Sequence, residues 1–305
     1  TAGSTWHAAG LLPYFNMSYA TTHIHDYSIK FYKTLKEETG QDPGFYVVGH
    51  LRMAQTAARM DEYMLYASTA ETCGVPYEWM TPAQIKDRWP LVRTEDLKGA
   101  IYHPTDGYIN PADVTNAMAA GARQLGVTIE QRWQADGFEW TGSEWKVTLT
   151  KMVETGGNLV PSEEQVVVTA EHVVAASGNH APRTAKLLGI KTPAIVVEHQ
   201  YIVTEPDPAL VEYRKTQPQH PVLRDADAKW YVREERGGWI LGPYEEGAPA
   251  RFEYGVPASF RADLYPLDLE RIEEEYMSMI HRIPSSETVG LKDDYNGPIC
   301  YTPDG

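Results

Sequence analysis

The most restrictive feature of this sequence is its first ten residues, TAGSTWHAAG, where small side chains surround Trp6 and His7. Three alanines and two glycines supply too little apolar surface to anchor a core. Residues with little bulk beyond the backbone let the chain come close to another surface. The segment therefore predicts backbone lying against a flat ligand, with Trp6 and His7 presented to that ligand.

Composition places the chain among acidic proteins with a sizeable core. Its 305 residues suit one large domain or two, and 42% of them are hydrophobic. The net charge of −15 argues against a nucleic-acid partner and against an anionic membrane surface, because both require clustered Lys and Arg. The sequence shows neither an apolar run of transmembrane length nor a signal peptide. These features predict a cytoplasmic enzyme, or an enzyme of the mitochondrial matrix if the source is eukaryotic.

Apolar residues at helical spacing mark the predicted helices. They cover residues 22–39, 57–72, 82–89, 111–125, 182–188 and 266–281. The first helix carries Ile24, Tyr27, Phe31 and Leu35 on its apolar face, and the second carries Met60, Tyr63, Met64 and Ala67. The last helix is expected to turn Leu269, Ile272, Tyr276 and Met279 or Ile280 inward. Each long helix is therefore amphipathic, with one face available for packing.

Runs of β-forming residues mark the predicted strands. They cover residues 45–53, 99–103, 127–130, 137–140, 145–150, 165–169, 172–176, 195–204, 230–234 and 239–242. Short turns join 137–140 to 145–150 and 230–234 to 239–242, so both pairs are interpreted as hairpins. The polar stretch 154–164 contains a Gly-Gly pair and is interpreted as a surface turn. Because the sequence has no repeat and no linker-like break, we expect interleaved domains rather than domains in series.

Common signatures of catalytic and nucleotide sites are missing from the sequence. It contains no GxGxxG, no P-loop, no HExxH and no GxSxG. His23 and His25 are interpreted as a solvated helix end rather than as metal ligands, so no metal site is predicted. Cys73 and Cys300 lack metal or redox spacing, and free thiols are favoured over a disulfide, which stays open as an alternative.

Seven short phrases remain, and their succession is informative. They occupy residues 3–10, 106–111, 173–178, 198–201, 231–234, 242–245 and 296–304, and their sequences are GSTWHAAG, DGYINP, VVAASG, EHQY, YVRE, GPYE and NGPICYTPD. In this order they resemble the flavin-dependent dimethylglycine and sarcosine dehydrogenases of the D-amino-acid oxidase superfamily. The resemblance extends over essentially all 305 residues. No single phrase is specific, whereas the seven in sequence make a specific match.

In that family the histidine of the first phrase carries FAD covalently through the flavin 8α-methyl group, and the resemblance assigns this role to His7. An imidazole nitrogen is nucleophilic enough to attack that position of an oxidised flavin, and the tether tunes the cofactor as an electron acceptor. The alternative is a buried histidine bonded to backbone. The phrase implies further cofactor contacts from its other members, Ser4, Thr5, Trp6, Ala8, Gly10 and Leu11.

The third phrase resembles the end of the strand that completes the FAD domain. Ala176, Ser177 and Gly178 lack bulk, which lets the dinucleotide pass close to the backbone. Relatives often have alanine where this chain has Ser177. The alternative interpretation is a core strand that ends at a turn.

The resemblance places His199 and Tyr231 in the substrate pocket over the flavin. His199 is expected to accept a proton or to orient the substrate near neutral pH. Tyr231 is expected to hydrogen-bond the substrate carboxylate or His199, and Tyr244 to line the same pocket. Arg52 is a candidate partner for the substrate carboxylate. The alternatives are ordinary core packing for Tyr231 and a surface charge for Arg52.

The implied fold is mixed α/β, with a Rossmann-like FAD/NAD(P)-binding domain interleaved with a substrate domain built on a large antiparallel sheet. Residues 1–44, 106–192 and 286–305 are assigned to the FAD domain, and 45–105 and 193–285 to the substrate domain. The family's GxGxxG unit binds the pyrophosphate at a helix N-terminus, and it would precede this sequence. Family segments also follow the last phrase. We therefore expect a piece of a longer flavoenzyme, trimmed at both ends.

The implied reaction is oxidative N-demethylation of dimethylglycine or sarcosine, with hydride transfer from the N-methyl carbon to the flavin. The implied partners are an N-methylated amino acid and an electron acceptor, either an electron-transfer flavoprotein or oxygen. Tetrahydrofolate is a possible second cofactor in a region outside this chain. Two alternatives stay open: a superfamily oxidase that acts on another secondary or tertiary amine, and a non-catalytic piece of such an enzyme.

Overall fold

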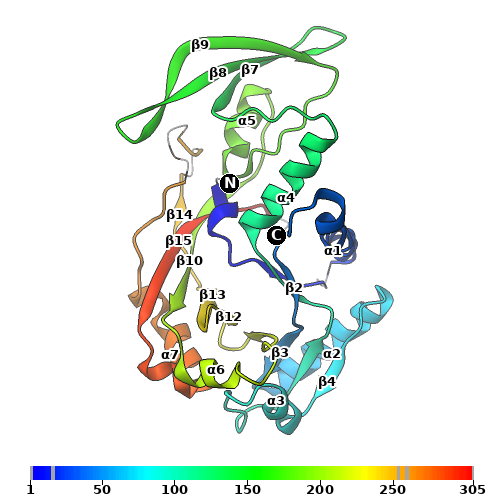
Figure 1. Cartoon of the computed structure of the whole chain (residues 1–305), viewed down its shortest axis with the longest axis vertical. Coiled ribbons are helices and arrows are strands. Elements are labelled where there is room, and N and C mark those ends of the chain that lie inside the picture. The colour runs from blue at the N-terminus through cyan, green and yellow to red at the C-terminus, as the bar shows by residue number, and fades with distance from the viewer. Residues whose placement is uncertain (1–2, 15–17, 253–254, 258–259, 261, 304–305) are drawn as a thin grey trace.

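The computed structural model describes residues 3–14, 18–252, 255–257, 260 and 262–303. Thr1 and Ala2 of the opening segment and Asp304 of the last phrase lie outside the described residues. Figure 1 shows a β-rich lower body, a three-stranded sheet at the top and helices between and beside them. The predicted mixed α/β class is confirmed.

A large sheet dominates the lower body. Its strand order is β14-β10-β13-β12-β11-β3-β5-β4, and β15 pairs with β10 beside this path. All neighbours run antiparallel except β11 and β3, which are parallel. The strands are β3 (His50–Ala54), β4 (Glu78–Met80), β5 (Gly99–His103), β10 (Ile195–Thr204), β11 (Val222–Asp225), β12 (Trp230–Glu235), β13 (Gly238–Pro243), β14 (Ala250–Arg251) and β15 (Leu291–Tyr301).

Seven helices occur in the described residues, and their ends follow capping chemistry. They are α1 (Tyr19–Thr39), α2 (Ala57–Thr72), α3 (Pro82–Arg88), α4 (Pro111–Gln124), α5 (Ala181–Leu187), α6 (Pro208–Tyr213) and α7 (Glu273–Arg282). The Ser18 side chain caps α1, which ends at Gly40 with φ of 76°. Thr81 and Gln84 form a capping box on α3, and Asn110 caps α4.

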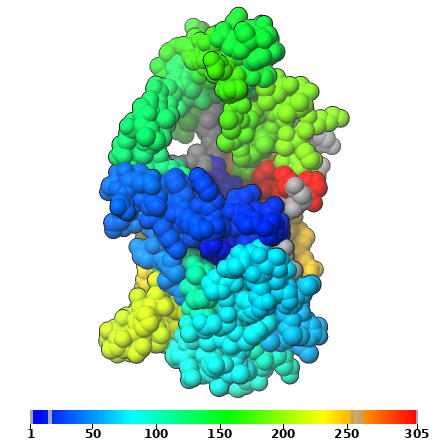
Figure 2. Space-filling view, turned by 90° about the vertical axis from the view of Figure 1, so that its right-hand side faces the viewer, coloured from blue at the N-terminus to red at the C-terminus, as the bar shows by residue number. Residues whose placement is uncertain are grey.

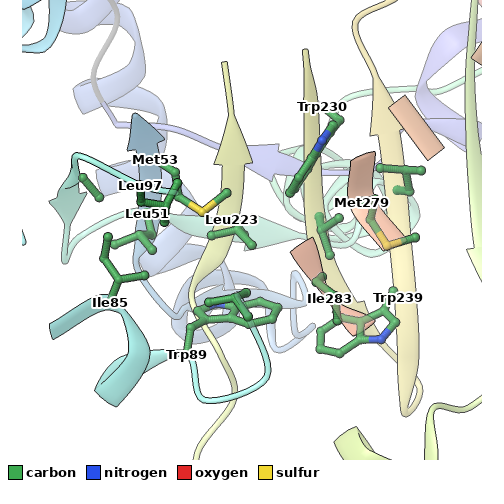
Figure 3. Packing of buried hydrophobic residues seen from close by; sticks show 14 of the residues in the cluster. Leu51, Met53, Ile85, Trp89, Leu97, Leu223, Trp230, Trp239, Met279 and Ile283 are labelled. Atoms are coloured by element: carbon green, nitrogen blue, oxygen red, sulfur yellow. The ribbon is translucent and has the colours of Figure 1, made fainter. Parts of the chain in front are cut away.

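The main core lies on one face of the large sheet. Leu51 and Met53 of β3, Leu223 of β11 and Trp230 of β12 are fully or almost fully buried there. Trp89, Trp239, Ile85, Met279 and Ile283 complete the layer (Figure 3). Trp89 donates its indole N–H group to the Pro221 carbonyl, Trp239 donates to the Asp207 carboxylate, and Trp230 donates to the Ser278 hydroxyl. Because successive strand residues point to opposite faces, their neighbours, including Arg52 and Tyr231, lie on the other face.

A second sheet joins the N-terminal segment to the helical layer. Its order is β1-β6-β2, with β1 at Leu11–Leu12, β2 at Phe45–Val47 and β6 at Gly107–Ile109. A Cβ on Gly107 would lie 1.9 Å from the Tyr46 carbonyl oxygen, so this strand contact requires glycine. Figure 2 shows α1 as a band across one side, between the upper sheet and the α2 region.

The upper sheet is a meander, and it corrects one prediction. Its order is β7-β8-β9, with β7 at Trp133–Trp140, β8 at Trp145–Thr155 and β9 at Asn158–Ala170. Residues 154–164 are therefore not a surface turn. They form the far end of a long hairpin that turns at Gly156 and Gly157, which have φ of 59° and 81°. The alternating pattern there was polar on both faces, which hid the strand.

Several other predicted elements are wrong. Residues 127–130 and 172–176 are irregular rather than strands, and Val174 is 89% exposed. A strand requires a hydrogen-bonded neighbour, and the described part of the chain pairs none with them. The segment 45–53 is two strands, β2 and β3. Its break is at Gly49, where a Cβ would lie 2.2 Å from the Tyr102 hydroxyl.

The predicted apolar faces of the helices also need correction. Ile24, Tyr27, Met64 and Leu269 are 65%, 73%, 55% and 43% exposed. Other members of the predicted faces are buried as expected, namely Leu35, Tyr63, Ala67, Ile272 and Met279. The α1 helix also buries Ile29, which was not predicted. Helical spacing identifies an apolar face, whereas the packing partner determines which part of the face is covered.

Cys73 and Cys300 are free and half-buried. No helix among the described residues is both long enough and apolar enough to cross a membrane. The remaining short helices are 3-10 turns: η1 (Gly3–His7), η2 (Gly178–His180), η3 (Glu270–Ile272) and η4 (Pro284–Thr288).

Candidate active site

The His7 side chain lies against the backbone of β15. It closes the η1 turn and is 7% exposed. A Cβ on Gly297 would lie 2.2 Å from the imidazole Cε1 atom, well inside any real contact. The ring therefore occupies the space that any other residue at position 297 would fill. The glycine of the NGP phrase makes this seat for His7.

The segment around His7 is fastened at both ends. The Ser4 hydroxyl donates to the Pro298 carbonyl at 2.6 Å and accepts from the Asn179 side chain at 3.0 Å. On the other side, the Arg233 Nε donates to the carbonyl of Ala9 at 2.9 Å. These bonds come from β15, η2 and β12, which are far apart in sequence. The opening segment is thus held on the large sheet by three separate elements.

Buried polar atoms around this segment lack hydrogen-bond partners among the described residues. They are the Trp6 Nε1, the His7 Nε2, the Ser177 Oγ and the Asn179 Oδ1. Buried polar groups in folded proteins are nearly always paired, and an unpaired one costs about 1–3 kcal/mol. Donors and acceptors gathered in this way fit a polar, planar ligand such as the flavin of FAD. This observation supports the proposed cofactor contacts.

The strand register brings His199 to the same place. His199 lies opposite Gly297 in the β10–β15 ladder, and Tyr201 lies opposite Tyr295, with stacked rings 4.7 Å apart. Burial lowers the pKa of His199. Burial also lowers the pKa of His7, and the positive charge of His199 adds to the decrease. Both imidazoles are therefore neutral at physiological pH, as a nucleophile or a proton acceptor must be.

Tyr231 and Tyr244 continue the site across the sheet. The Tyr231 ring lies over Gly242, where a Cβ would be 1.9 Å from its Cζ atom. Tyr244 lies 5.5 Å from Tyr231 and 6.2 Å from His199, measured between ring centroids. Burial raises the pKa of Tyr231, so its phenol stays protonated and can donate a hydrogen bond.

Two arginines, Arg224 and Arg52, follow Tyr231 on the next strands of the sheet. Only Arg52 was identified from the sequence. Arg224 of β11 lies opposite Arg52 of β3 and opposite Tyr231 of β12. Its guanidinium is 4.6 Å from the centre of the Tyr244 ring, and that of Arg52 is 4.9 Å from Tyr66. Arg52 is only 8% exposed, so it is not a surface charge. The signal that marks Arg224 is its place inside an otherwise buried strand.

Neither arginine has an anionic partner in the described part of the chain. No ion pair or side-chain hydrogen bond joins Arg52 or Arg224 to a carboxylate there, and both Nε atoms are buried without a partner. The nearby buried carboxylate of Asp106 is already engaged with His50 at 3.2 Å and with the Tyr14 amide at 3.0 Å. Arg52 is buried and Arg224 is half-buried, and a guanidinium removed from water without a partner is costly, so this pair is suited to an anionic ligand.

Some predicted residues lie at the margin of this arrangement. Thr5 and Ala8 are exposed, and Leu11 pairs with Tyr108 in the small sheet. Ala176 lies exposed in the irregular segment before η2, and Gly178 is the exposed first residue of η2. The prediction that a strand ends at Ser177 is wrong, although Ser177 is near the Asn179–Ser4 contact in sequence. Gly10 is required by geometry, because a Cβ there would be 2.0 Å from the Ile109 carbonyl oxygen.

One of two cavities in this region touches the opening segment. This cavity, of about 290 Å³, is lined by Trp6, Ala8, Tyr201 and Tyr295 and lies beside the His7 seat. The other cavity, of about 620 Å³, lies between the start of α4 and the turn that joins β12 to β13. The smaller cavity is the one whose lining includes residues of the opening segment, and neither lining includes His199, Tyr231 or Tyr244. No group of three or more metal-type ligands occurs among the described residues.

Comparison with known proteins agrees with this geometry. The chain is 35% identical over 309 residues to the mitochondrial dimethylglycine dehydrogenase of Rattus norvegicus, covering 100% of this chain and 34% of the relative. It is 30% identical to the mitochondrial sarcosine dehydrogenase of Homo sapiens, covering 100% of this chain and 31% of the relative. The chain thus spans about a third of these relatives.

A solved structure supports the fold. The L-proline dehydrogenase of P. horikoshii superimposes with a TM-score of 0.78 at 22% identity, covering 99% of this chain and 73% of that one. The predicted resemblance is confirmed, because a single family model, described as FAD dependent oxidoreductase, matches residues 1–305. This chain belongs to the FAD dependent oxidoreductase family.

Proposed function

We propose that the chain contributes the catalytic centre of an enzyme that removes an N-methyl group from dimethylglycine or sarcosine by oxidation. The names of the rat and human relatives support this substrate class. The observation that carries the proposal is the row of His7, His199 and Tyr231, which ends at arginines that have no acid partner among the described residues. Such a row matches a small amino acid with an amine at one end and a carboxylate at the other.

The carboxylate is proposed to bind at Arg224, with Arg52 behind it. The Arg224 guanidinium already lies against Tyr244, which itself lies between Arg224 and His199. A carboxylate here accepts charge-assisted hydrogen bonds, which are about twice as strong as neutral ones. Its amine end then points along the row toward His199. Arg52 lies one strand farther away and supplies positive charge at longer range.

His199 is proposed to keep the substrate amine in its neutral form. A protonated amine has no lone pair to support loss of hydride from the N-methyl carbon, so a proton must leave first. Burial holds the His199 imidazole neutral and ready to accept that proton. Tyr231 stays protonated and donates to the carboxylate or to the His199 ring, which orients the substrate.

FAD is the proposed cofactor, attached covalently at His7. The segment that carries Trp6 and His7, together with Ser177 and Asn179, offers unsatisfied polar atoms for the flavin edge. Bound there, the flavin would supply the capacity to accept a hydride, which the side chains of this chain lack. The residues of this chain hold the substrate, exclude water and move its amine proton. Gly297 keeps His7 seated, and Ser4 and Arg233 hold its segment on the sheet.

The remaining assignments are also proposals. Residues 1–44, 106–192 and 286–305 form the FAD side, and 45–105 and 193–285 form the substrate side. The electron acceptor is an electron-transfer flavoprotein or oxygen, and tetrahydrofolate is a possible acceptor of the one-carbon unit outside this chain. The mitochondrial matrix is the proposed location in a eukaryote, in line with the relatives' names, and the cytoplasm otherwise.

Anaerobic mixing of the flavin-loaded full-length protein with dimethylglycine or sarcosine tests the proposal. Loss of oxidised-flavin absorbance with formation of formaldehyde supports it. The same mixture in air separates the acceptors, because peroxide release identifies an oxidase. Reduction by a different amine, with none by these two, contradicts the substrate class. Absence of reduction by any secondary or tertiary amine contradicts the catalytic role.

A further inference from the structure

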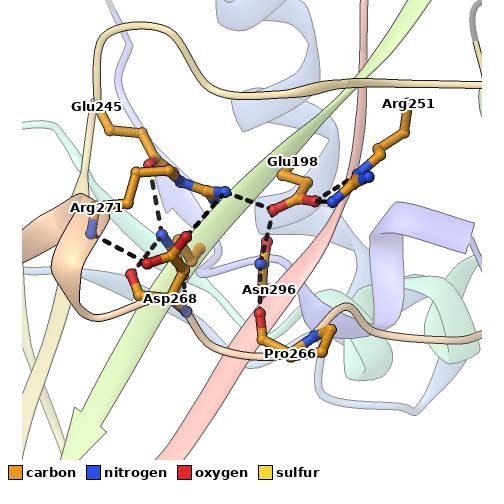
Figure 4. Close-up of polar contacts among 8 residues, drawn as sticks. Glu198, Glu245, Arg251, Pro266, Asp268, Arg271 and Asn296 are labelled. Carbon is orange, nitrogen blue, oxygen red and sulfur yellow. Dashed lines mark hydrogen bonds and ion pairs between the residues drawn. The ribbon is translucent and has the colours of Figure 1, made fainter.

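Figure 4 shows a network of ion pairs and hydrogen bonds centred on Glu198 and Arg271. Glu198 and Gln200 flank His199 in sequence and are 2% and 0% exposed. Because side chains alternate along a strand, both point away from the face that carries His199. The Glu198 carboxylate accepts from Arg271 at 2.7 Å, from Asn296 at 2.9 Å and from Arg251.

One guanidinium joins the two segments that carry the aromatic pair. Arg271, in η3, donates through Nη1 to Glu198. Its Nε and Nη2 atoms donate to the two carboxylate oxygens of Glu245. Glu198 immediately precedes His199, and Glu245 immediately follows Tyr244. A single planar side chain therefore bridges the backbone beside each of the two rings that lie 6.2 Å apart on the far face.

The rest of the network fixes Arg271 itself. The Gln200 side chain accepts from the Asp268 amide at 3.1 Å and donates to the Asp268 carbonyl at 3.1 Å. The Asn296 side chain donates to the Pro266 carbonyl at 2.8 Å. These contacts attach the segment before η3 to β10 and β15. Burial works to raise the pKa of Glu198, but the hydrogen bonds outweigh it, so the pKa is lowered and the carboxylate stays charged.

We propose that Arg271 is a positioning residue that sets the distance between His199 and Tyr244. This inference rests on the proposed function of that pair. A guanidinium presents donors in a rigid fork and can hold Glu245 with two bonds while it reaches Glu198 with a third. An ammonium is a point charge on a flexible stem and cannot hold both carboxylates in this way. The shape of Arg271, not its charge alone, is what the bridge requires.

The experiment compares three variants of the flavin-loaded full-length protein. Arg271→Met removes the bridge, and Arg271→Lys keeps the charge but not the fork. Arg251→Met is the matched control, because Arg251 pairs with the same Glu198 carboxylate but makes no bond to Glu245, and its side chain is 49% exposed. Steady-state kcat and KM are measured with dimethylglycine. Calorimetry gives the Kd of betaine, the trimethylated analogue without a nitrogen lone pair.

We expect kcat to fall about ten- to a hundredfold in both Arg271 variants, because displacing catalytic groups by about 1 Å costs that much. The Kd of betaine should stay within about threefold, since Arg224 still binds the carboxylate. The control should keep kcat within about twofold. If Arg271→Met does not fold, Arg271→Lys and Glu245→Gln carry the same comparison.

Full kcat in Arg271→Lys overturns the proposal, because charge alone then suffices. An equal loss of kcat in Arg251→Met overturns it as well, since that outcome reflects general damage. A parallel loss of betaine binding in the Arg271 variants has the same meaning. If the unaltered protein binds betaine but oxidises no amine, the proposed function fails. The positioning role is then judged by whether Arg271→Lys changes the His199–Tyr244 distance in a crystal structure.

Discussion

Gly297 offers the sharpest test of how the fold seats His7. A Cβ at this position would lie 2.2 Å from the Cε1 atom and 2.5 Å from both nitrogens of the imidazole. Ordinary contact begins near 3.4 Å, so Gly297→Ala forces the ring or the strand to move by about 1.2 Å. The displaced atoms belong to the ring that is the proposed attachment point for the flavin. The substitution is therefore expected to disturb the site far more than the fold.

Two assays separate the effect of Gly297→Ala on folding stability from its effect on the flavin site. Overpacking of a well-packed site costs about 1–3 kcal/mol, which lowers the midpoint of thermal unfolding by several degrees. Misplacement of a reacting group by about 1 Å costs about a hundredfold in rate. We expect Gly297→Ala to lose covalent flavin almost completely, as measured by absorbance after denaturation. Its unfolding transition, followed by calorimetry, should stay cooperative.

Gly290→Ala is the matched control. It lies just before the same strand, and the nearest atom to an added Cβ is the Glu205 Cγ at 3.7 Å, an ordinary contact. This variant should retain wild-type flavin content and rate. The reasoning is refuted if Gly297→Ala carries covalent flavin at the wild-type level, or if Gly290→Ala loses flavin to the same extent.

Three further predictions follow from the same geometry. Arg224→Met should raise KM for dimethylglycine about ten- to a hundredfold in steady-state assays, because a charged hydrogen bond is worth about 1.5–3 kcal/mol; an unchanged KM would exclude Arg224 from the carboxylate site. Trp239→Ala should destabilise the fold by about 3–5 kcal/mol in denaturant titrations, because the side chain is fully buried; a loss below about 1 kcal/mol would contradict the packing described. Thermal stability should decrease as pH falls from about 6.5 to about 4, because burial lowers the pKa of His103 to about 4 and the unfolded chain takes up that proton first. His103→Asn should flatten this dependence in calorimetry, and an unchanged slope would assign it to other groups.

Much of the fold could be predicted from local sequence. Helix caps are local chemistry, so the predictions at 57–72, 82–89 and 111–125 agree with α2, α3 and α4 to within about two residues. Strands β10, β12 and β13 of the large sheet carry strong β-formers, and β10 was predicted at its observed bounds, 195–204, whereas β11, β14 and β15 were not predicted. The helices and strands that could be predicted are therefore those whose caps or β-forming residues lie within the element itself.

The errors share a physical cause, which is that they depend on partners distant in sequence. Residues 172–176 have β-forming composition but no paired neighbour among the described residues, whereas the start of β9 was interpreted as a polar turn and pairs with β8. The later part of β9 was predicted as the strand 165–169. The exposure of Ile24 depends on what packs against α1. No local pattern carries that information.

The candidate site likewise contains residues that the sequence predicts and residues that only the folded chain reveals. The short phrases pointed to His7, His199, Tyr231 and Tyr244, and the structure places His199 and Tyr244 next to each other and His7 beside the residue opposite His199. Arg224 was missed, because its importance comes from lying beside Tyr231 in a strand ladder that joins separate segments. The Arg271 bridge is likewise a product of three segments meeting.

The most direct test of the central claim is the fate of the flavin when the protein is denatured. The full-length protein and its His7→Ala variant are precipitated with acid, washed and examined for flavin absorbance. The account predicts a yellow pellet for the unaltered protein and a colourless pellet for His7→Ala, with free flavin in the supernatant. A yellow His7→Ala pellet, or a colourless pellet from the unaltered protein, contradicts the assignment of His7 as the covalent anchor.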